Sequence, residues 1–289
     1  MKRDTKHERA QIVNKTLNYM YTYISTDISL DELARLNSIS KYHFHRIFKE
    51  ETGENVFEKI TSIRLQKAAN LLITDNYSTI TQIASFCGYA SHTSFIKAFK
   101  KRFTYTPSQW RKGAFRKFTK NKFDIDDESI KELKGLEPSI KVCPQRTCAY
   151  LRLKGYTQAN LIKVWQRLLA FEYQSDLKDS THIGIYHDST IMIPYDECNY
   201  IAALEVNENF EPKTSISKLK IHESLCAVFR HTGVYGDIER LLIYIYQYWL
   251  PNSGYEVITL PAYAVFTQNH YLEENDTFIL DFHVPIRVV

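Results

Sequence analysis

The chain has 289 residues, of which 44% are hydrophobic and 24% are charged, with a formal net charge of +4. The length favours two domains over one, and the composition excludes disordered, collagen-like and low-complexity classes. No apolar run approaches the roughly 20 residues that a membrane-spanning helix needs, and the charged start is not typical of a signal peptide. We therefore expect a cytoplasmic protein without membrane contact. The five scattered cysteines predict neither a disulfide framework nor a metal site.

The net charge conceals two parts of opposite sign. Residues 1–123 hold 22 Lys and Arg against 10 Asp and Glu, whereas the remaining residues hold 15 against 23. A change of this size at one point in the chain indicates two bodies with different partners, and the basic body suits the phosphate backbone of DNA. A merely solvated basic surface would carry the same charge, so the motifs have to decide between the two interpretations.

Apolar residues recur with helical spacing through most of residues 8–112. After a short helix at 30–36 and a turn, Ser40 is placed to cap a helix whose apolar stripe is Phe44, Ile47 and Phe48. The opposite face of this helix carries one polar and cationic row: Tyr42, His45, Arg46 and Lys49. A tight turn followed by such a helix is typical of the recognition helix of a helix-turn-helix unit.

The same pattern recurs about fifty residues later. A short helix at 80–86 is followed by a turn at Gly88, and Ser91 is placed to cap a second helix. The apolar side of this helix is Phe95, Ala98 and Phe99, and its polar side includes His92, Thr93, Lys97 and Lys100. Residues 56–73 predict one long helix between the units, a rigid connector for two recognition helices. If it holds them ~34 Å apart, a monomer would reach successive major grooves.

These residues resemble the AraC/XylS family. Cys87-Gly88-Tyr89 and Thr106-Pro107-Ser108-Gln109-Trp110-Arg111 closely match the family signature, and residues 29–53 match its upstream half. One position departs from the pattern, because Thr104 stands where the family usually has Gly, which puts the local turn in doubt. The resemblance implies a sequence-specific transcription factor.

The resemblance also implies roles for the two polar rows. Arg46 is the candidate for bidentate contact with guanine, and the neighbouring base readers are Tyr42 and His45 in the first groove and His92, Thr93, Ser94 and Lys97 in the second. The candidates for phosphate contacts, which give affinity and register, are Lys41, Lys49, Lys100 and Lys101. For each residue the alternative is a solvated surface side chain.

The acidic half repeats itself beyond a linker at residues 114–138. Cys148-Ala149, Arg152 and Gly155 return 78 residues later as Cys226-Ala227, Arg230 and Gly233, which predicts an internal duplication. Each half reads as a strand, a helix and two strands, with the helices at 158–171 and 237–250. The predicted fold is therefore an all-α double helix-turn-helix domain at residues 1–113 followed by a duplicated β-α-β-β domain at residues 139–289.

Paired units of this kind leave a cleft between the halves, and aromatic residues are available to line it. The candidates for binding an effector are Tyr156, Trp165, Tyr235, Trp249, Tyr263 and Phe266. The alternative for each of them is a place in the core.

Residues 139–288 resemble the GyrI-like effector-binding domain. The matching motifs are His187-Asp188, Cys198-x-Tyr200, Gly233-x-Tyr235, Trp249-Leu250-Pro251-x-Ser253-Gly254 and Val284-Pro285-Ile286. The resemblance implies a sensor of small, often amphipathic or cationic molecules. Ala264 stands where the family commonly has Glu, and Asn199 where it often has Arg. Ala264 favours a neutral or more hydrophobic effector, or a carboxylate from another strand such as Glu205, or a site that has lost its ligand.

We therefore predict a transcriptional activator without cofactor or catalytic activity, whose partners are double-stranded DNA, a small hydrophobic or amphipathic effector and RNA polymerase. Two enzymatic alternatives are weaker. A GyrI-like hydrolase would use the Glu that Ala264 replaces. An alkyl-transfer repair protein needs a Pro-Cys-His-Arg motif, but Cys143-Pro144-Gln145-Arg146 has the first two residues in the opposite order and has no His. In a third alternative the acidic half docks on another protein, such as RNA polymerase or gyrase, without a ligand.

Overall fold

The computed structural model describes residues 6–75, 77–123, 130, 132–175, 177, 180–211, 216–274 and 276–289. The chain forms two compact units. The sheet unit comprises Met1–Lys15, Leu136–Ile238 and Pro261–Ile286, and the helical unit comprises Thr16–Gly135, Glu239–Leu260 and Arg287–Val289. The division into units thus falls inside two helices, α1 and α11, as well as in the predicted linker, part of which (124–129 and 131) lies outside the described residues.

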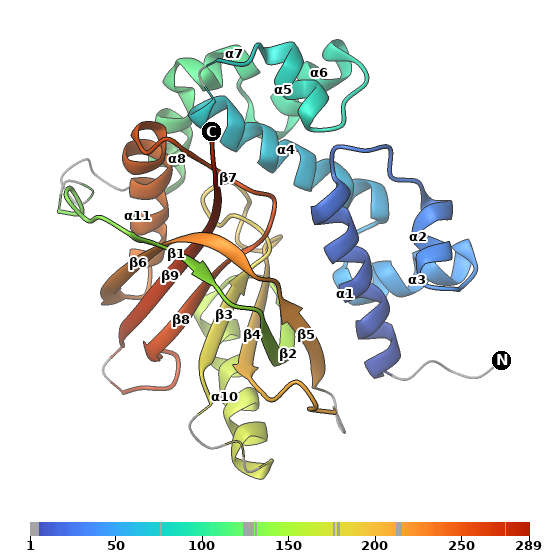
Figure 1. Cartoon of the computed structure of the whole chain (residues 1–289), viewed down its shortest axis with the longest axis vertical. Coiled ribbons are helices and arrows are strands. Elements are labelled where there is room, and N and C mark those ends of the chain that lie inside the picture. Colours follow the sequence, from blue (N-terminus) through green and yellow to red (C-terminus); the bar gives the residue numbers. More distant parts are fainter. Residues whose placement is uncertain are drawn as a thin grey trace. The chain divides into compact units, whose positions relative to one another are not determined.

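The helices predicted for the basic part are confirmed (Figure 1). They are α1 (Lys6–Tyr23), α2 (Leu30–Leu36), α3 (Lys41–Thr52), α4 (Val56–Thr74), α5 (Ile80–Phe86) and α6 (His92–Phe103). The structure adds α7 (Pro107–Gln109), a π-helical turn η1 (Trp110–Ala114) and α8 (Phe115–Phe123). Helix α8 occupies residues predicted as linker. Among the described residues, no helix has the length and apolar character to cross a membrane.

Side-chain caps fix where the helices of the helical unit begin. Ser40 and Ser91 have extended backbone and accept the N–H groups of His43 and Ser94, both at 3.3 Å, which confirms the two predicted caps. Helix α6 ends at Phe103 and is capped by Thr104, whose φ of 63° is left-handed. The turn for which the family has Gly is therefore formed here by Thr, in a conformation that strains a β-branched residue.

Aromatic side chains form the core behind the second helix-turn-helix. Phe95, Phe99 and Phe103 lie on one side of α6 and are buried, and the rings of Phe99 and Phe103 are 5.6 and 4.8 Å from that of Trp110. The indole N–H of Trp110 donates to the carbonyl of Ala69 in α4 at 3.1 Å. Ala98, predicted for the same core stripe, is half-buried.

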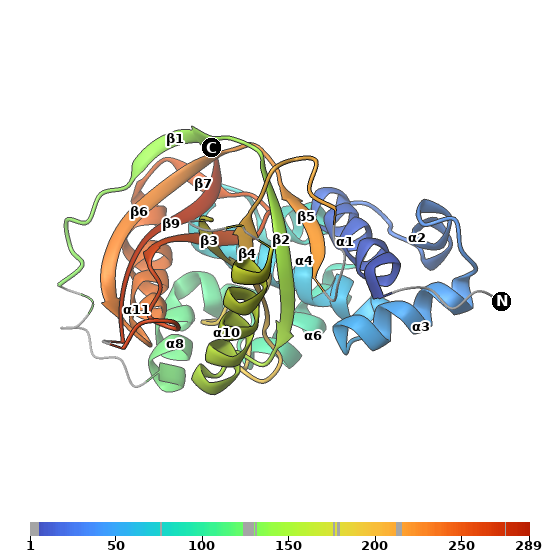
Figure 2. The same ribbon diagram turned by 90° about the horizontal axis from the view of Figure 1, so that it is seen from below.

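The sheet unit contains antiparallel strands and helix α10 (Gln158–Gln174), which packs against β2 and β4 (Figure 2). The strands are β1 (Ser139–Cys143), β2 (Arg146–Lys154), β3 (His182–Tyr186), β4 (Asn199–Glu205), β5 (Ser217–Ile221), β6 (Ser224–Val234), β8 (Ala262–Gln268) and β9 (Thr277–Val288). Their order in the sheet is β1-β6-β9-β8-β3-β4-β2-β5, and the short strand β7 (Tyr255–Val257) pairs with β9 outside this order.

Two features differ from the predicted β-α-β-β halves. Each half has an additional first strand, β1 or β5, which pairs with the second strand of the other half. Four of the five residues of β1 are exposed, so this strand has little of the apolar alternation that predicts a strand. In addition, the helix predicted at 237–250 is α11 (Asp237–Tyr244), continued by a π-helical turn η2 (Ile245–Trp249) and a 3₁₀ turn η3 (Leu250–Asn252).

Candidate functional site

The first candidate site is the polar face of α3. Tyr42 is 81% exposed, Lys41, Arg46 and Lys49 are exposed, and His45 is half-buried. The opposite face of the helix is fixed in the core by buried Phe44, Ile47 and Phe48. Because α3 is amphipathic, packing of its apolar stripe turns the polar row outward. Lys41 also forms an ion pair of 2.5 Å with Asp31 of α2.

Helix α6 presents a second face of the same kind. All six residues predicted to contact DNA from this helix are exposed: His92, Thr93, Ser94, Lys97, Lys100 and Lys101. Polar side chains lie in its first turn, and its last turn is cationic, where Lys and Arg also interact favourably with the helix dipole. The structure therefore brings the eleven predicted DNA-contacting residues together on two helices of one unit.

Helix α4 ties the two helix-turn-helix units to one another. Arg64 donates from Nε to the carbonyl of Ile24 at 3.2 Å and from Nη2 to that of Thr26 at 2.7 Å, so it holds the turn after α1. Lys67 Nζ donates to Ser25 Oγ at 2.8 Å, and Ser25 Oγ donates to the carbonyl of Phe86 at the end of α5 at 2.6 Å. Burial lowers the pKa of Lys67 below its ordinary value. The sequence predicts α4 as a connector but does not reveal these polar contacts.

Gly88 allows the turn after α5 to pack closely against Arg64 and the carbonyl of Ile24. Its φ is +76°, and a Cβ placed there would lie 2.8 Å from both Arg64 Nε and the carbonyl oxygen of Ile24. Only Gly combines this conformation with this separation. The motif Cys87-Gly88-Tyr89 therefore allows the turn between α5 and α6 to reach the carbonyls that Arg64 binds.

The six aromatic residues predicted to bind an effector lie in different places. Tyr156, Trp165 and Tyr263 are buried in the sheet unit, and Tyr263 stacks on His283 with 4.4 Å between ring centroids. Tyr235 is half-buried at the end of β6. Trp249 belongs to the helical unit, where it stacks on Tyr255 at 6.2 Å. Of the six, Phe266 lines the pocket described below.

Aromatic rings fill the part of the sheet where Ala264 lies. Ala264 pairs with Gly184, and a Cβ added to Gly184 would overlap the hydroxyl of Tyr200. Tyr200 is buried and accepts the indole N–H of Trp165 at 3.3 Å, and burial raises its pKa well above the ordinary value. The face that carries Ala264 is therefore occupied at this point by the chain's own rings.

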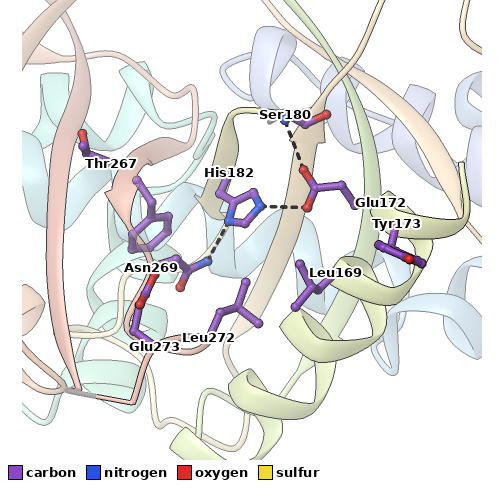
Figure 3. A pocket seen from close by; sticks show the side chains of 10 residues that line it. Leu169, Glu172, Tyr173, Ser180, His182, Thr267, Asn269, Leu272 and Glu273 are labelled. Carbon is purple, nitrogen blue, oxygen red and sulfur yellow. Dashed lines mark hydrogen bonds and ion pairs between the residues drawn. The ribbon is translucent and has the colours of Figure 1, made fainter. Parts of the chain in front are cut away.

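A pocket of about 600 Å³ lies at the edge of the same sheet where β3 begins and β8 ends (Figure 3). It lies among the end of α10, the start of β3, the end of β8 and the loop that follows β8. The residues that line it are Leu169, Glu172, Tyr173, Ser180, His182, Phe266, Thr267, Asn269, Leu272 and Glu273. Apolar and aromatic walls with a few convergent polar groups are typical of small-molecule sites.

Glu172 is the central polar group of this pocket. The residue is 6% exposed; its Oε1 accepts the backbone N–H of Ser180 at 3.1 Å, and its Oε2 is 3.1 Å from Nε2 of His182. The ring of His182 lies 5.4 Å from that of Trp165, and its Nδ1 is 3.5 Å from the amide nitrogen of Asn269. Figure 3 shows Ser180, Glu172, His182 and Asn269 as one chain of contacts across the pocket.

The helical spacing of α10 identifies Glu172 as a buried carboxylate, although the prediction considered only aromatic residues. Leu161, Trp165 and Leu168 form the buried stripe of α10, and Glu172 continues it with the same spacing. A carboxylate on a buried stripe is a candidate binding group, since carboxylates are rarely buried without a partner. Glu205, named as one possible substitute for the missing strand Glu, forms an ion pair with Arg146 and does not line this pocket.

Asn199 also has a structural role of its own. Its backbone N–H and its side-chain amide donate to the buried carboxylate of Asp188 at 2.9 and 2.8 Å. The side-chain amide of Asn199 thus donates a hydrogen bond to Asp188 at the position where the family often has Arg.

Among the described residues, no group of three or more His, Cys, Asp and Glu side chains is arranged to hold a metal ion.

Comparisons with known proteins identify two domains in the chain. The GyrI-like small molecule binding domain matches residues 136–287, and a helix-turn-helix domain of the AraC type matches residues 33–113. The uncharacterized HTH-type transcriptional regulator YbfP of Bacillus subtilis is 37% identical over 123 residues, 42% of this chain and 39% of that protein. The xylose operon regulatory protein of Escherichia coli is 33% identical over 99 residues, 34% of this chain and 25% of that protein.

A third relative is similar over a longer stretch. The transcriptional regulator Rob of Salmonella typhimurium is 24% identical over 169 residues, which are 56% of this chain and 58% of that protein. The chain spans well under half the length of the first two relatives. More than half of it is matched by the GyrI-like model, and a helix-turn-helix model matches residues 33–113. The chain therefore belongs to the GyrI-like family and carries an AraC-type helix-turn-helix domain in front of its small molecule binding domain.

Proposed function

We propose that this protein is a sequence-specific transcriptional regulator that activates its target genes in response to a small molecule. The observation that carries the proposal is the pair of amphipathic helices α3 and α6, each with an exposed polar and cationic row and each capped and packed in one unit. Regulators of transcription among its relatives support the same function.

The two rows divide into base readers and phosphate contacts. Arg46 is the side chain of α3 best suited to a bidentate contact with guanine, because it is exposed in the middle of the polar row. Lys97 has the corresponding place on α6. Lys100 and Lys101, near the end of α6, are placed for phosphate contacts, which add affinity without sequence information. The protein works where DNA is accessible, in the cytoplasm, and RNA polymerase is its partner in activation.

The pocket at the edge of the sheet is the site at which the effector binds. Its volume suits a small organic molecule, and its walls combine Leu169, Phe266 and Leu272 with the polar chain from Glu172 to Asn269. The symmetrical order of the strands, with Cys148 in β2 and Cys226 in β6, supports an internal duplication of this part of the chain.

Selection from random DNA tests the DNA-binding part of the proposal. Wild type, Arg46→Ala and Lys97→Ala, each as the full chain, are incubated separately with a pool of random duplexes, and the DNA that each protein binds is sequenced. We expect wild type to enrich an asymmetric motif of two elements about one helical turn apart, which is roughly 10 base pairs. Each variant should lose information in one element and keep it in the other. A wild-type pool without any enriched sequence would contradict the proposal.

Transcription from a template that contains the selected motif tests the regulatory part. Purified RNA polymerase should give more transcript when the protein is present, and the increase should depend on the motif. Less transcript would instead indicate a repressor.

A further inference from the structure

The positive charge of the basic part is concentrated in its second half. All ten Asp and Glu of residues 1–123 lie in residues 1–75, whereas residues 76–123 hold ten Lys and Arg and no carboxylate side chain. Four of these ten cations lie in α8, beyond residues 33–113 that match the helix-turn-helix domain. We propose that α8 is a third DNA-binding element, which contacts the phosphate backbone beside the base pairs that α6 reads. The inference rests on the proposed regulatory function and adds a binding surface to it.

Helix α8 is amphipathic. Phe115 and Thr119 are buried on one face, whereas Arg116, Lys117 and Lys120 are exposed on the other. At about 3.6 residues per turn, these three cations lie within roughly 100° of one another around the helix axis. The helix contains no Asp or Glu, so no carboxylate of α8 itself neutralises them. The three side chains therefore form a compact cationic surface, which we call the α8 face.

Helix α8 packs on the end of α6. The ring of Phe118 lies 5.9 Å from that of Phe103, the last residue of α6, and 5.2 Å from that of Trp110. The last turn of α6 is itself cationic. The aromatic packing thus holds two positively charged segments next to each other, although like charges repel. A polyanion that binds across both segments offsets this repulsion.

The residues around α8 fix its direction. Gly113 has a φ of 101° and interrupts the helical path between η1 and α8. The hydroxyl of Thr119 accepts Nε2 of Gln247 at 2.8 Å, and the guanidinium of Arg116 lies 5.6 Å from the centre of the Tyr248 ring. Both partners lie in η2, which belongs to the helical unit. A surface that is fixed before binding loses less conformational entropy when DNA binds.

The α8 face suits phosphates rather than bases. Base readout requires side chains that match the donors and acceptors of base edges, whereas Lys and Arg neutralise phosphates without sequence information. The nine residues of α8 extend over roughly 14 Å, which corresponds to about four base pairs at about 3.4 Å each. Because α8 packs on the end of α6, its contacts should lie within about five base pairs of the element that α6 reads.

The salt dependence of DNA binding tests the proposal. The full chain is titrated by fluorescence anisotropy against a duplex with the selected motif and against a scrambled duplex, between about 50 and 200 mM salt. Lys117→Gln/Lys120→Gln removes two cations of the α8 face and keeps Arg116, which contacts Tyr248. Each phosphate contact contributes about 0.9 to the slope of log affinity against log salt, so the slope should become shallower by about two. The deficit of the variant relative to wild type should then be about tenfold larger at the lowest salt than at the highest.

A variant of another helix is the matched control. Lys163→Gln/Arg167→Gln removes two exposed cations from α10 of the sheet unit, where no DNA contact is proposed. Net charge falls equally in both variants, but the control should keep the slope of wild type. The ratio of affinities for the motif and the scrambled duplex should not change in Lys117→Gln/Lys120→Gln, because phosphate contacts do not distinguish sequences.

Ethylation of single phosphates locates the contact. Wild type should be inhibited by ethylation of one or more phosphates within about five base pairs of the element read by α6, and Lys117→Gln/Lys120→Gln should tolerate ethylation at those positions. The proposal is overturned if the variant keeps the wild-type slope, if the control loses as much slope as the variant, or if the same ethylated phosphates inhibit both proteins. Equal affinity of wild type for the motif and the scrambled duplex would instead contradict the regulatory function. The slope on the scrambled duplex would still test α8, because it reports phosphate contacts alone.

Discussion

A single methyl group at position 88 should loosen the connection between the two helix-turn-helix units. In Gly88→Ala the backbone keeps a left-handed φ, which costs about 1–2 kcal/mol for a residue with a Cβ. The new Cβ also lies 2.8 Å from Arg64 Nε and from the carbonyl of Ile24, so Arg64 has to give up a hydrogen bond of a charged group, worth about 1.5–3 kcal/mol. We expect the free energy of unfolding of the helical unit to fall by about 3 kcal/mol.

Hydrogen–deuterium exchange measures this loss without the need to unfold the whole chain. Under conditions where exchange reports opening equilibria, amides of α4, α5 and α6 should exchange about 100-fold faster, since each 1.36 kcal/mol corresponds to a factor of ten. Gly113→Ala is the matched control, because Gly113 also has positive φ, +101°, but a Cβ there would meet nothing within 4 Å. In the control, amide exchange should become faster only by the amount that corresponds to the cost of a left-handed φ, about 1–2 kcal/mol. Equal effects of the two substitutions would refute the role given to the contact with Arg64.

Three other predictions concern DNA contacts and pH. Arg46→Ala should cost about 1–3 kcal/mol of binding at one base position, whereas Lys100→Ala should weaken all sequences alike and reduce the salt slope by about one, both measured by titration of duplexes at several salt concentrations. His270 is 3% exposed, and burial lowers its pKa to about 4, so His270 should contribute a loss of about 2 kcal/mol in the stability of the sheet unit between pH 7 and 5, because the unfolded chain, but not the folded one, takes up the proton. Burial alone would raise the pKa of Asp75, but hydrogen bonds from Ser78 and Tyr77 hold it below its ordinary value, so their contribution to stability should be lost as pH falls below about 4.

Each of these predictions has an outcome that contradicts it. An equal loss of affinity for all DNA sequences in Arg46→Ala would contradict the role of Arg46 as a base reader. His270→Phe should make the loss of stability between pH 7 and 5 smaller by about 2 kcal/mol, while the buried His283, whose pKa is also lowered to about 4, keeps its own contribution. An unchanged profile would assign the pH dependence to other groups. Asp75→Asn should remove the acid-induced loss in the turn before α5, seen as exchange of the amides of Tyr77 and Ser78, and persistence of the loss would contradict the assignment.

The helical part of this protein is predictable in detail because its signals are local. Ser40 and Ser91 are caps, Phe44 and Phe95 begin apolar stripes, and both kinds of signal act within one or two turns of the chain. The contacts of Arg64 are not predictable in this way. They join residues about 40 positions apart in the sequence, and neither Ile24 nor Thr26 takes part with its side chain.

The sheet part shows where pattern analysis fails. Its aromatic residues predict a cleft, but Trp165, Tyr156 and Tyr200 pack against one another and fill the centre of the face instead. Large rings serve a core and a binding site equally well, so their presence does not distinguish the two. The pocket depends on how the end of α10 meets the loop after β8, and Glu172 and Asn269 are almost a hundred residues apart. Such a site becomes visible only with the tertiary structure.

Under the proposed function, the connection through α4 would give the protein a direction on DNA. The two helices that it joins carry different side chains, Tyr42 to Lys49 on α3 and His92 to Lys97 on α6, so the targets proposed for them should differ in sequence. A dimer with two identical readers binds a palindrome and looks the same from either end, whereas a chain with two unlike readers in fixed order does not. An operator inverted in place would therefore turn the bound protein around with respect to the gene, and the orientation of the site becomes part of the regulatory signal.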